Sequence, residues 1–215
     1  MRSFVLSFIL LVSMTLVGCS SFHSRTAKNS NPVALDNTAL SWESKAIISD
    51  YKNKKNVQIK MDILAAGDQY LRIDITGSLG LHLASLVYKK GRIEYFITPE
   101  RKYFYGVANE NSFRPLLRMP LHPVELIDAI KQQIPRGPWW DCERLNTKQP
   151  KVCFRKDQNL KITWTQQAGS QKTVVIQSAD YEIRWFIDNT PTEVQFQTGA
   201  FELRKPSGFK SISLQ

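Results

Sequence analysis

Three cysteines and three histidines are the residues of this chain best suited to covalent or metal chemistry. His23, His82 and His122 stand far apart in sequence, and no HExxH pattern places two histidines on one helix face. The chain also lacks a Gly-x-Ser-x-Gly elbow and a glycine-rich phosphate loop. We therefore predict no enzyme, no catalytic residue and no metal site, although residues distant in sequence could still converge in space.

Cys19 ends an uncharged N-terminal stretch. Ser3–Val17 follows a short basic start, carries no charge and falls short of the about 20 residues that a membrane-spanning helix needs. It is typical of the apolar region of a secretory signal. The run ends Leu16-Val17-Gly18-Cys19, which resembles a bacterial lipobox, where a peptidase cleaves before a cysteine whose thiolate accepts diacylglycerol. We predict a lipoprotein signal peptide over residues 1–18 and a lipidated Cys19. An ordinary signal peptide is the alternative.

Residues 19–38 are expected to form a flexible tether from the lipidated Cys19, because they lack periodicity and are rich in Ser and Asn. Their mean reach would be about 24 Å. No cofactor is expected, and the covalent groups expected on Cys19 are a diacylglycerol and an N-acyl chain. Ser20 follows Cys19, where the enterobacterial sorting rule reads Asp as an inner-membrane signal. The lipobox resemblance therefore implies an outer-membrane protein, lipid-anchored and facing the periplasm.

The formal charge of the chain is +10, with a pI near 9.6, and it becomes +9 once Arg2 leaves with the signal peptide. Such a basic excess would suit nucleic acid, but an exported lipoprotein does not meet it, so no nucleic-acid partner is expected. Two uses of the charge stay open. It attracts anionic lipid headgroups, or it is a solvated surface.

Apolar and polar residues alternate from Leu40 onward. In 57–63, 71–75 and 93–97 every second residue is apolar, which is typical of antiparallel strands with one dry and one wet face. Turn signals such as Lys90-Gly91 separate these runs. Further strands are expected at 40–49, 81–89, 102–107, 151–156, 159–166, 172–178, 181–187, 192–198, 201–205 and 209–214.

Residues 109–134 break the alternation. Ser112–Met119 predicts one or two helical turns closed by Pro120, and His122-Pro123-Val124-Glu125 has proline and glutamate where a second helix would begin. An antiparallel sheet with one helical insertion is expected to curl into an incomplete barrel whose concave side the helices cover. The fold predicted for residues 39–215 is mainly β (α+β), an unclosed antiparallel β-barrel of about 11 strands with a short helical lid.

Cys142 and Cys153 have ten residues between them. In an exported protein two such cysteines are expected to form a disulfide across a hairpin. Closing a loop of about 12 residues would stabilise the fold by roughly 3 kcal/mol. Two buried free thiols are the alternative.

The segment from Trp42 to Pro135 resembles the LolB family of outer-membrane lipoprotein receptors, within the LolA/LolB superfamily. Ser78 stands where that family often has proline, and the cysteine pair is not a feature of the family. The matching residues, in the family's order, are Ala46-Ile47-Ile48-Ser49-Asp50, Gly67-Asp68-Gln69-Tyr70-Leu71-Arg72-Ile73, Ile75-Thr76-Gly77-Ser78-Leu79-Gly80, and Leu117 through Met119-Pro120-Leu121 with Val124-Glu125-Leu126 and Ile134-Pro135.

This resemblance implies a hydrophobic cavity beneath the helical lid. The outer-membrane member of the superfamily accepts triacylated lipoproteins from a soluble periplasmic carrier and inserts them into the membrane. The partners implied are a LolA-like carrier, acylated lipoproteins as cargo and outer-membrane lipids, with the receptor acting as a monomer. An envelope scaffold or assembly lipoprotein, and a lipid- or glycolipid-binding lipoprotein using the same cavity, remain alternatives.

The exposed leucine of the family's protruding loop, which promotes membrane insertion, maps onto Leu79. It lies within Gly77, Ser78, Leu79 and Gly80, whose glycines permit a tight projecting turn. The walls of an acyl-chain cavity are expected from the inward strand faces and from the lid, with an ordinary filled core as the alternative. The expected wall residues are Trp42, Ile59, Met61, Ile73, Ile75, Ile127 and Ile130.

Overall fold

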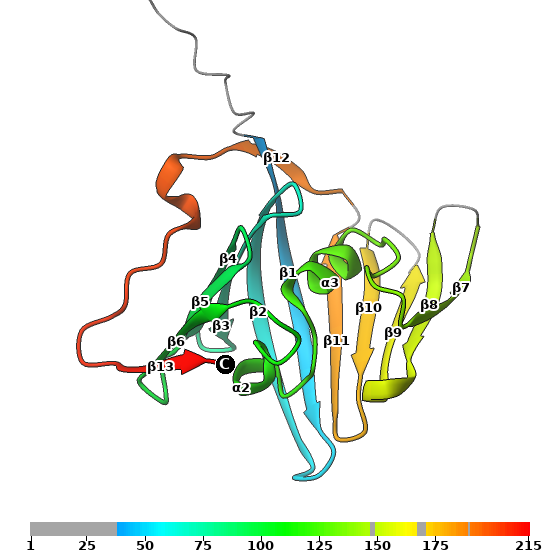
Figure 1. Cartoon of the computed structure of the whole chain (residues 1–215), viewed down its shortest axis with the longest axis horizontal. Helices are drawn as coiled ribbons and strands as arrows, with labels where there is room; N and C mark the ends of the chain where they lie inside the picture. Colours follow the sequence, from blue (N-terminus) through cyan, green and yellow to red (C-terminus); the bar gives the residue numbers. More distant parts are fainter. Residues whose placement is uncertain (1–37, 147–148, 167–170, 189) are drawn as a thin grey trace, which may run out of the picture. The chain divides into compact units, whose positions relative to one another are not determined.

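A computed structural model of the chain describes residues 38–146, 149–166, 171–188 and 190–215. The predicted signal peptide, Cys19 and the tether up to residue 37 lie outside these described residues. The described part forms a single curved sheet with two α-helices against its concave side (Figure 1). The elements are β1 (Thr38–Asp50), β2 (Lys55–Ala66), β3 (Tyr70–Gly77), β4 (His82–Lys89), β5 (Arg92–Ile97), β6 (Lys102–Val107), α2 (Arg114–Leu117), α3 (Pro123–Ile130), β7 (Trp140–Arg144), β8 (Pro150–Arg155), the 3₁₀ helix η1 (Lys156–Gln158), β9 (Leu160–Gln166), β10 (Gln171–Gln177), β11 (Tyr181–Asp188), β12 (Thr192–Gln195), the 3₁₀ helix η2 (Thr198–Phe201) and β13 (Lys210–Leu214).

The sheet runs in the order β13-β6-β5-β4-β3-β2-β1-β11-β10-β9-β8-β7. Two strands pair with the same edge of β1: β11 pairs with its residues 44–50, and β12 pairs with its first residues, 38–41. Every pair of neighbouring strands is antiparallel except β13 and β6, which are parallel. β13 and β7 are the two ends of this order, so the predicted unclosed barrel is confirmed. It has 13 strands instead of about 11, and one edge strand is parallel.

One predicted strand was wrong, and one strand of the structure was not predicted. Residues 201–205 do not form a strand. The chain forms η2 there and then continues without regular structure to β13, while Phe201 is buried in a small cluster with Val87 of β4. The strand β7 was not predicted, since Trp140–Arg144 is short and three of its five residues are charged. Its position is set by pairing with β8 rather than by an apolar pattern of its own.

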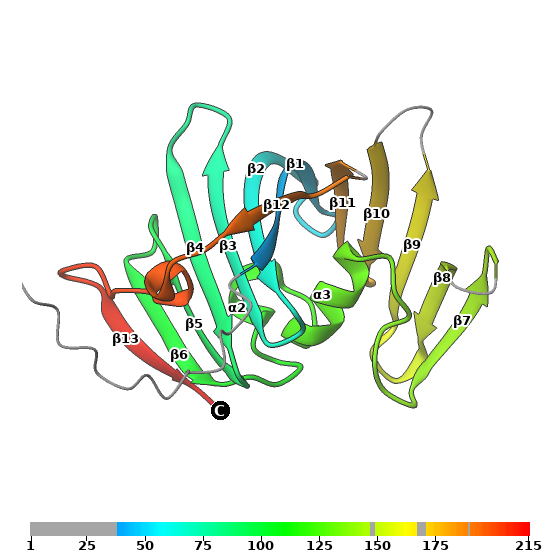
Figure 2. The ribbon, with the colours of Figure 1, turned by 90° about the horizontal axis from the view of Figure 1, so that it is seen from above.

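Both predicted helices of the lid segment, residues 109–134, are confirmed. α2 ends at Leu117, and the left-handed φ of 59° at its C-cap, Arg118, stops the helix before Pro120. α3 begins with Pro123, which lacks only an N–H that a first helical turn leaves unpaired. Seven of the eight residues of α3 are buried, including Glu125. In the view from above, α3 lies between the β1–β6 side of the sheet and the β7–β10 side (Figure 2).

The segment from β12 through η2 crosses the outer face of the sheet on its way to β13 (Figure 2). It brings Phe201, Phe196 and Leu203 against Val87 and Tyr70 on the face opposite the main core. Strand β4 is therefore buried on both faces from Ala84 to Tyr88. This covering explains why the sequence of β4 is a nearly continuous run of apolar residues instead of an alternation of apolar and polar ones.

Candidate functional site

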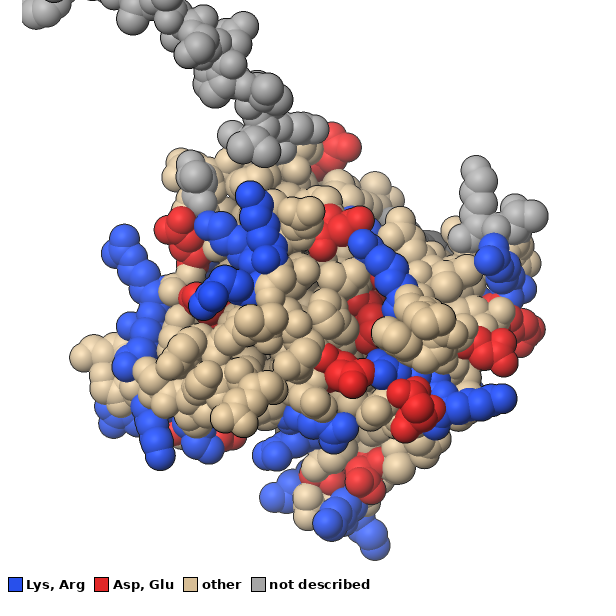
Figure 3. Space-filling view, in the orientation of Figure 1, with Lys and Arg blue, Asp and Glu red and all other residues tan. Residues whose placement is uncertain are grey.

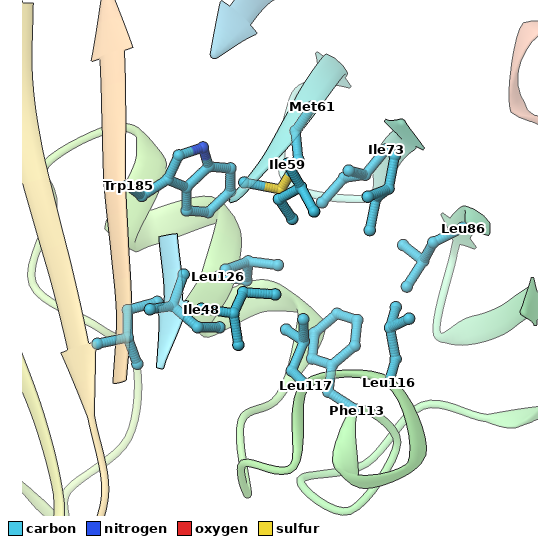
Figure 4. Close-up of a pocket in the computed structure, with 13 residues that line it drawn as sticks. Ile48, Ile59, Met61, Ile73, Leu86, Phe113, Leu116, Leu117, Leu126 and Trp185 are labelled. Atoms are coloured by element: carbon cyan, nitrogen blue, oxygen red, sulfur yellow. The ribbon is translucent and has the colours of Figure 1, made fainter. Parts of the chain in front are cut away.

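A cavity lies between the concave face of the sheet and the lid segment. About 420 Å³ of space, open solvent included, lies between its walls, but only about 20 Å³ of it admits the centre of a water molecule, and every residue of its wall is apolar. The close-up shows side chains of the sheet facing side chains of the lid across this space (Figure 4). The lining residues are Ile48, Ile59, Met61, Ile73, Ile75, Leu86, Phe113, Leu116, Leu117, Leu126, Ile176, Ile183 and Trp185.

Four of the seven predicted wall residues, Ile59, Met61, Ile73 and Ile75, line this cavity. The other three do not line it, and each is at most 4% exposed within the packed core: Trp42, Ile127 and Ile130. Ile127 and Ile130 miss the cavity because of the direction of α3, whose last turn accepts hydrogen bonds from β9 and β10. Only Leu126 of α3 reaches the cavity.

Sequence reasoning missed nine wall residues. Alternation within the predicted strands places four of them on the apolar faces of their strands: Ile48, Ile176, Ile183 and Trp185. It does not show which residues of different strands lie around the same cavity. Phe113, Leu116 and Leu117 form the apolar side of the predicted first lid helix. That apolar spacing was the available signal for them.

Trp185 is the largest side chain of the wall that is almost fully buried, at 2% exposed. Its indole Nε1–H donates a 2.8 Å hydrogen bond to Ser44 Oγ, and Ser44 in turn donates to the Met61 carbonyl at 2.9 Å. The one polar atom of the ring is thereby satisfied outside the cavity. The wall that remains presents only hydrocarbon and the Met61 sulfur.

Polar contacts hold the first turn of α3 to strands β7 and β8. Glu125, 2% exposed, accepts hydrogen bonds from Trp140 Nε1 at 2.8 Å and from Arg155 Nη1 at 3.5 Å. Its second oxygen accepts the His122 N–H at 2.8 Å, while His122 Nδ1 accepts the Val124 N–H at 3.1 Å. This reciprocal capping box fixes the start of the helix and satisfies the buried carboxylate.

The last turn of α3 is held in the same way. Trp164 Nε1 donates to the Ala129 carbonyl at 2.9 Å, and Lys172 Nζ donates to the Ile130 carbonyl at 2.6 Å. Burial lowers the pKa of the Lys172 amine, which is 6% exposed as a residue. Its charge lies where the partial negative charge of the helix C-terminus favours a cation. α3 is thus fixed to the sheet at both ends.

α2 is held differently. None of its four residues is fully buried, and Leu116 and Leu117 face the cavity. The Arg114 side chain donates hydrogen bonds to Asn111 and to Gln158, and both bonds are exposed to solvent. Just before α2, the Tyr95 hydroxyl donates a buried 2.9 Å hydrogen bond to the Ser112 carbonyl. The roof of the cavity therefore has one part fixed at both ends by buried hydrogen bonds, α3, and one part, α2, whose own four residues are held mainly by apolar contact.

The predicted loop between β3 and β4 projects from the sheet. Gly77 donates its N–H to the Leu81 carbonyl and Gly80 donates to the Gly77 carbonyl, which closes a tight turn. Gly80 has a φ of +75°, a conformation that favours glycine. Leu79 at the tip is 86% exposed, and Leu81, which sequence reasoning did not single out, is 65% exposed.

Cys142 and Cys153 face each other as a cross-strand pair of β7 and β8, and a disulfide joins them. Across the described residues no group of three or more His, Cys, Asp or Glu side chains is placed to hold a metal ion. Among the helices in the described ranges, none is long and apolar enough to cross a membrane.

A sequence search finds no matching family model and no matching curated protein. Among solved structures, a LolA superfamily protein from Nitrosomonas europaea shares 5% identity, covers 77% of this chain and 90% of that chain, and gives a TM-score of 0.46. A putative outer membrane lipoprotein-sorting protein domain from Vibrio parahaemolyticus shares 4% identity over 77% and 89%, with a TM-score of 0.38. An uncharacterized conserved protein from Thermus thermophilus shares 6% identity over 80% and 90%, with a TM-score of 0.32. Since all three scores are below 0.5, none of these similarities assigns a function to the chain.

Proposed function

We propose that this protein is a lipid-anchored outer-membrane receptor of the LolB kind, which accepts acylated lipoproteins from a periplasmic carrier and inserts them into the outer membrane. The observation that carries the proposal is the pairing of two features in one domain. One is a wholly apolar cavity beneath a helical lid, and the other is a projecting loop with Leu79 exposed at its tip. A scaffold lipoprotein would need neither feature.

The cavity suits acyl chains because of what its walls lack. Exposing one methylene to water costs about 0.8 kcal/mol, so a chain of roughly a dozen would cost on the order of 10 kcal/mol outside an apolar environment. Aliphatic walls with Met61 make no directional demand on a chain and so tolerate different lengths. Transfer from a weaker-binding carrier through this cavity into a bilayer would run downhill.

The space beneath the lid is nearly filled by its own side chains. Only about 20 Å³ of the cavity can be reached by the centre of a water molecule, so an acyl chain enters only when the roof moves. α3 is fixed at both ends by buried hydrogen bonds, whereas α2 rests on apolar contacts. We therefore assign the opening movement to α2, Arg114–Leu117.

Transfer to liposomes tests the proposal. Asp36–Gln215 forms a compact unit, so a soluble form beginning at residue 36 is mixed with a carrier loaded with a labelled lipoprotein and with liposomes. The parent protein is expected to accept the lipoprotein and pass it to the liposomes. Leu79→Glu is expected to accept it but insert it at least about tenfold more slowly, because burying one leucine contributes about 1.5–3 kcal/mol.

The matched control is Leu145→Glu. Leu145 is also a leucine exposed in a loop, at 57%, but it follows β7 at the other end of the sheet. This variant is expected to behave like the parent protein. If the parent protein takes nothing from a functional cognate carrier, the receptor proposal fails. A lipid- or glycolipid-binding role for the same cavity would then replace it.

A further inference from the structure

The leucine loop, residues 77–81, lies beside a group of basic side chains. The loop and the β5–β6 turn, Thr98–Arg101, are neighbouring turns at the same end of the sheet. His82, next to Leu81, contacts Thr98 Oγ1 at 3.3 Å, and Thr98 donates its N–H to the Leu83 carbonyl at 2.8 Å. Side chains that lie next to the β5–β6 turn therefore also lie next to the base of the leucine loop.

The basic rim is defined as Arg101, Lys102, Lys205 and Lys210. Lys102 and Lys210 face each other in register on the parallel strands β6 and β13, a like-charge pair that costs stability. The Lys210 N–H donates to the Arg101 carbonyl at 2.9 Å, and Lys205 Nζ donates to Ser211 Oγ. In Figure 3, Lys and Arg side chains gather along the edge that carries β13.

The rim has almost no compensating negative charge. Lys102 pairs with Glu100 at 2.7 Å, whereas Arg101, Lys205 and Lys210 form no ion pair with any residue that the structure describes. All three are exposed. A concentration of uncompensated positive charge beside a projecting apolar tip is complementary to a surface that carries negative charge above an apolar interior.

The depths of the two features also match such a surface. Thr98, the first residue of the β5–β6 turn, is level with Leu83, so the tip at Leu79–Gly80 lies three or four residues beyond that level, at most about 10 Å at the rise of a strand. Figure 2 shows the β3–β4 turn extending farther than the β5–β6 turn. Interfacial segments bury their apolar face about 5–10 Å into the boundary between headgroups and acyl chains. With the leucines at that depth, the rim lies among the headgroups.

The hairpin end itself carries no charge. From Ile75 to Tyr88 the chain has no Lys, Arg, Asp or Glu, and the exposed large apolar side chains at its tip are Leu79 and Leu81, flanked by exposed Ser78 and His82. A loop that approached an acidic protein surface would gain nothing from an uncharged tip with two exposed leucines. A bilayer accepts such a tip without desolvating a charge.

We propose that the leucine loop and the basic rim form one docking surface for a bilayer rich in anionic lipid, in which Leu79 and Leu81 enter the leaflet while Arg101, Lys102, Lys205 and Lys210 bind lipid phosphates. This inference rests on the proposed function in one respect, that the leucine loop enters a membrane. It adds the class of membrane, a second inserted side chain and the residues that select the headgroups.

Vesicle binding without any cargo tests this surface. The form beginning at residue 36 is floated with vesicles of phosphatidylcholine alone and with vesicles containing one third phosphatidylglycerol. Each basic residue near an anionic surface is worth about a fivefold change in binding. Arg101→Gln/Lys210→Gln is therefore expected to bind anionic vesicles about 25-fold more weakly and neutral vesicles unchanged. Leu79→Glu is expected to weaken binding to both.

The control for net charge is Lys151→Gln/Lys161→Gln. It removes two exposed lysines from β8 and β9, which lie toward the opposite end of the strand order from β13. It is expected to bind anionic vesicles within about twofold of the parent protein. Equal losses in both double variants would overturn the proposal, since the effect would then be overall charge. Unchanged vesicle binding by Arg101→Gln/Lys210→Gln, with slower receipt of cargo from the carrier, would overturn it in favour of a carrier-binding surface.

The failures of the two proposals are distinguishable. Cargo insertion into neutral vesicles tests the receptor function without the rim, and cargo-free binding to anionic vesicles tests the rim without the receptor function. If the protein binds anionic vesicles but does not insert cargo into neutral vesicles, the receptor proposal is refuted and the docking-surface proposal stands.

Discussion

His122 makes the anchoring of the lid helix sensitive to pH. In its neutral form the imidazole Nδ1 accepts the Val124 N–H as the N-cap of α3, and it lies close to Glu125, whose carboxylate accepts the His122 N–H. Protonation places an N–H on Nδ1 opposite the Val124 N–H, so the cap is lost. Burial lowers the pKa of His122 below 6.5, with Glu125 and the Ala108 carbonyl opposing that effect.

The direction of the effect follows from this lowered pKa. The unfolded chain binds the proton near pH 6.5 and the folded chain only at lower pH, so stability is complete above pH 6.5 and is lost as the pH falls through the folded-state pKa. A histidine held neutral at pH 5 costs at most about 2 kcal/mol. Loss of an N-cap costs about 1 kcal/mol. The expected loss between pH 7.5 and pH 5 is therefore about 1–2 kcal/mol.

The measurement is urea unfolding of the form beginning at residue 36, at pH 7.5 and pH 5, for the parent protein and for His122→Asn. Asparagine caps a helix without titrating in this range, so the difference in free energy of unfolding between variant and parent should shift in favour of the variant by about 1–2 kcal/mol at pH 5. A variant-minus-parent difference that is the same at both pH values would refute the reasoning.

Three further changes are predicted to have defined effects on the stability of the same form. Ser44→Ala leaves the buried Trp185 indole N–H without its acceptor and should lower the free energy of unfolding by about 1–3 kcal/mol in urea melts; no loss would show that the bond is unimportant. Cys142→Ser/Cys153→Ser opens a short cross-strand loop and should lower stability by roughly 3 kcal/mol, and a reducing agent should affect the parent protein but not this variant. Leu126→Ala removes a 2% exposed side chain between lid and cavity and should cost about 2–5 kcal/mol by calorimetry, whereas Leu145→Ala should cost less than about 0.5 kcal/mol.

The strands were predictable where one face is dry and the other is wet. β2, β3 and β5 follow the alternation of the sequence because their inner faces are buried, while the outer face is largely exposed in β2 and half-buried in β3 and β5. β7 was missed since it is a short edge strand with charged residues. The false strand at 201–205 arose because Phe201 and Leu203 alternate like strand residues, whereas they pack against the outer face of the sheet.

The cavity was only half predictable. Local alternation identifies inward faces, and it found Ile59, Met61, Ile73 and Ile75. Which inward residues meet around one space depends on the sheet order, which brings β11 beside β1 across about 130 residues of chain. It depends also on the direction of α3, which is set by buried partners such as Lys172 that no local pattern reveals. The parallel pairing of β13 with β6 is another contact of this kind.

The central claim, that acyl chains occupy this cavity, is tested most directly by quenching of Trp185 fluorescence. An acylated lipopeptide with bromine atoms on its fatty chains is added to the form beginning at residue 36, because bromine quenches tryptophan on contact and Trp185 lines the cavity. The fluorescence of the parent protein should fall, most of that change should disappear in Trp185→Phe, and it should remain in Trp139→Phe, whose indole is 48% exposed outside the cavity. Quenching that persists in Trp185→Phe and disappears in Trp139→Phe would place the chains elsewhere and contradict the claim.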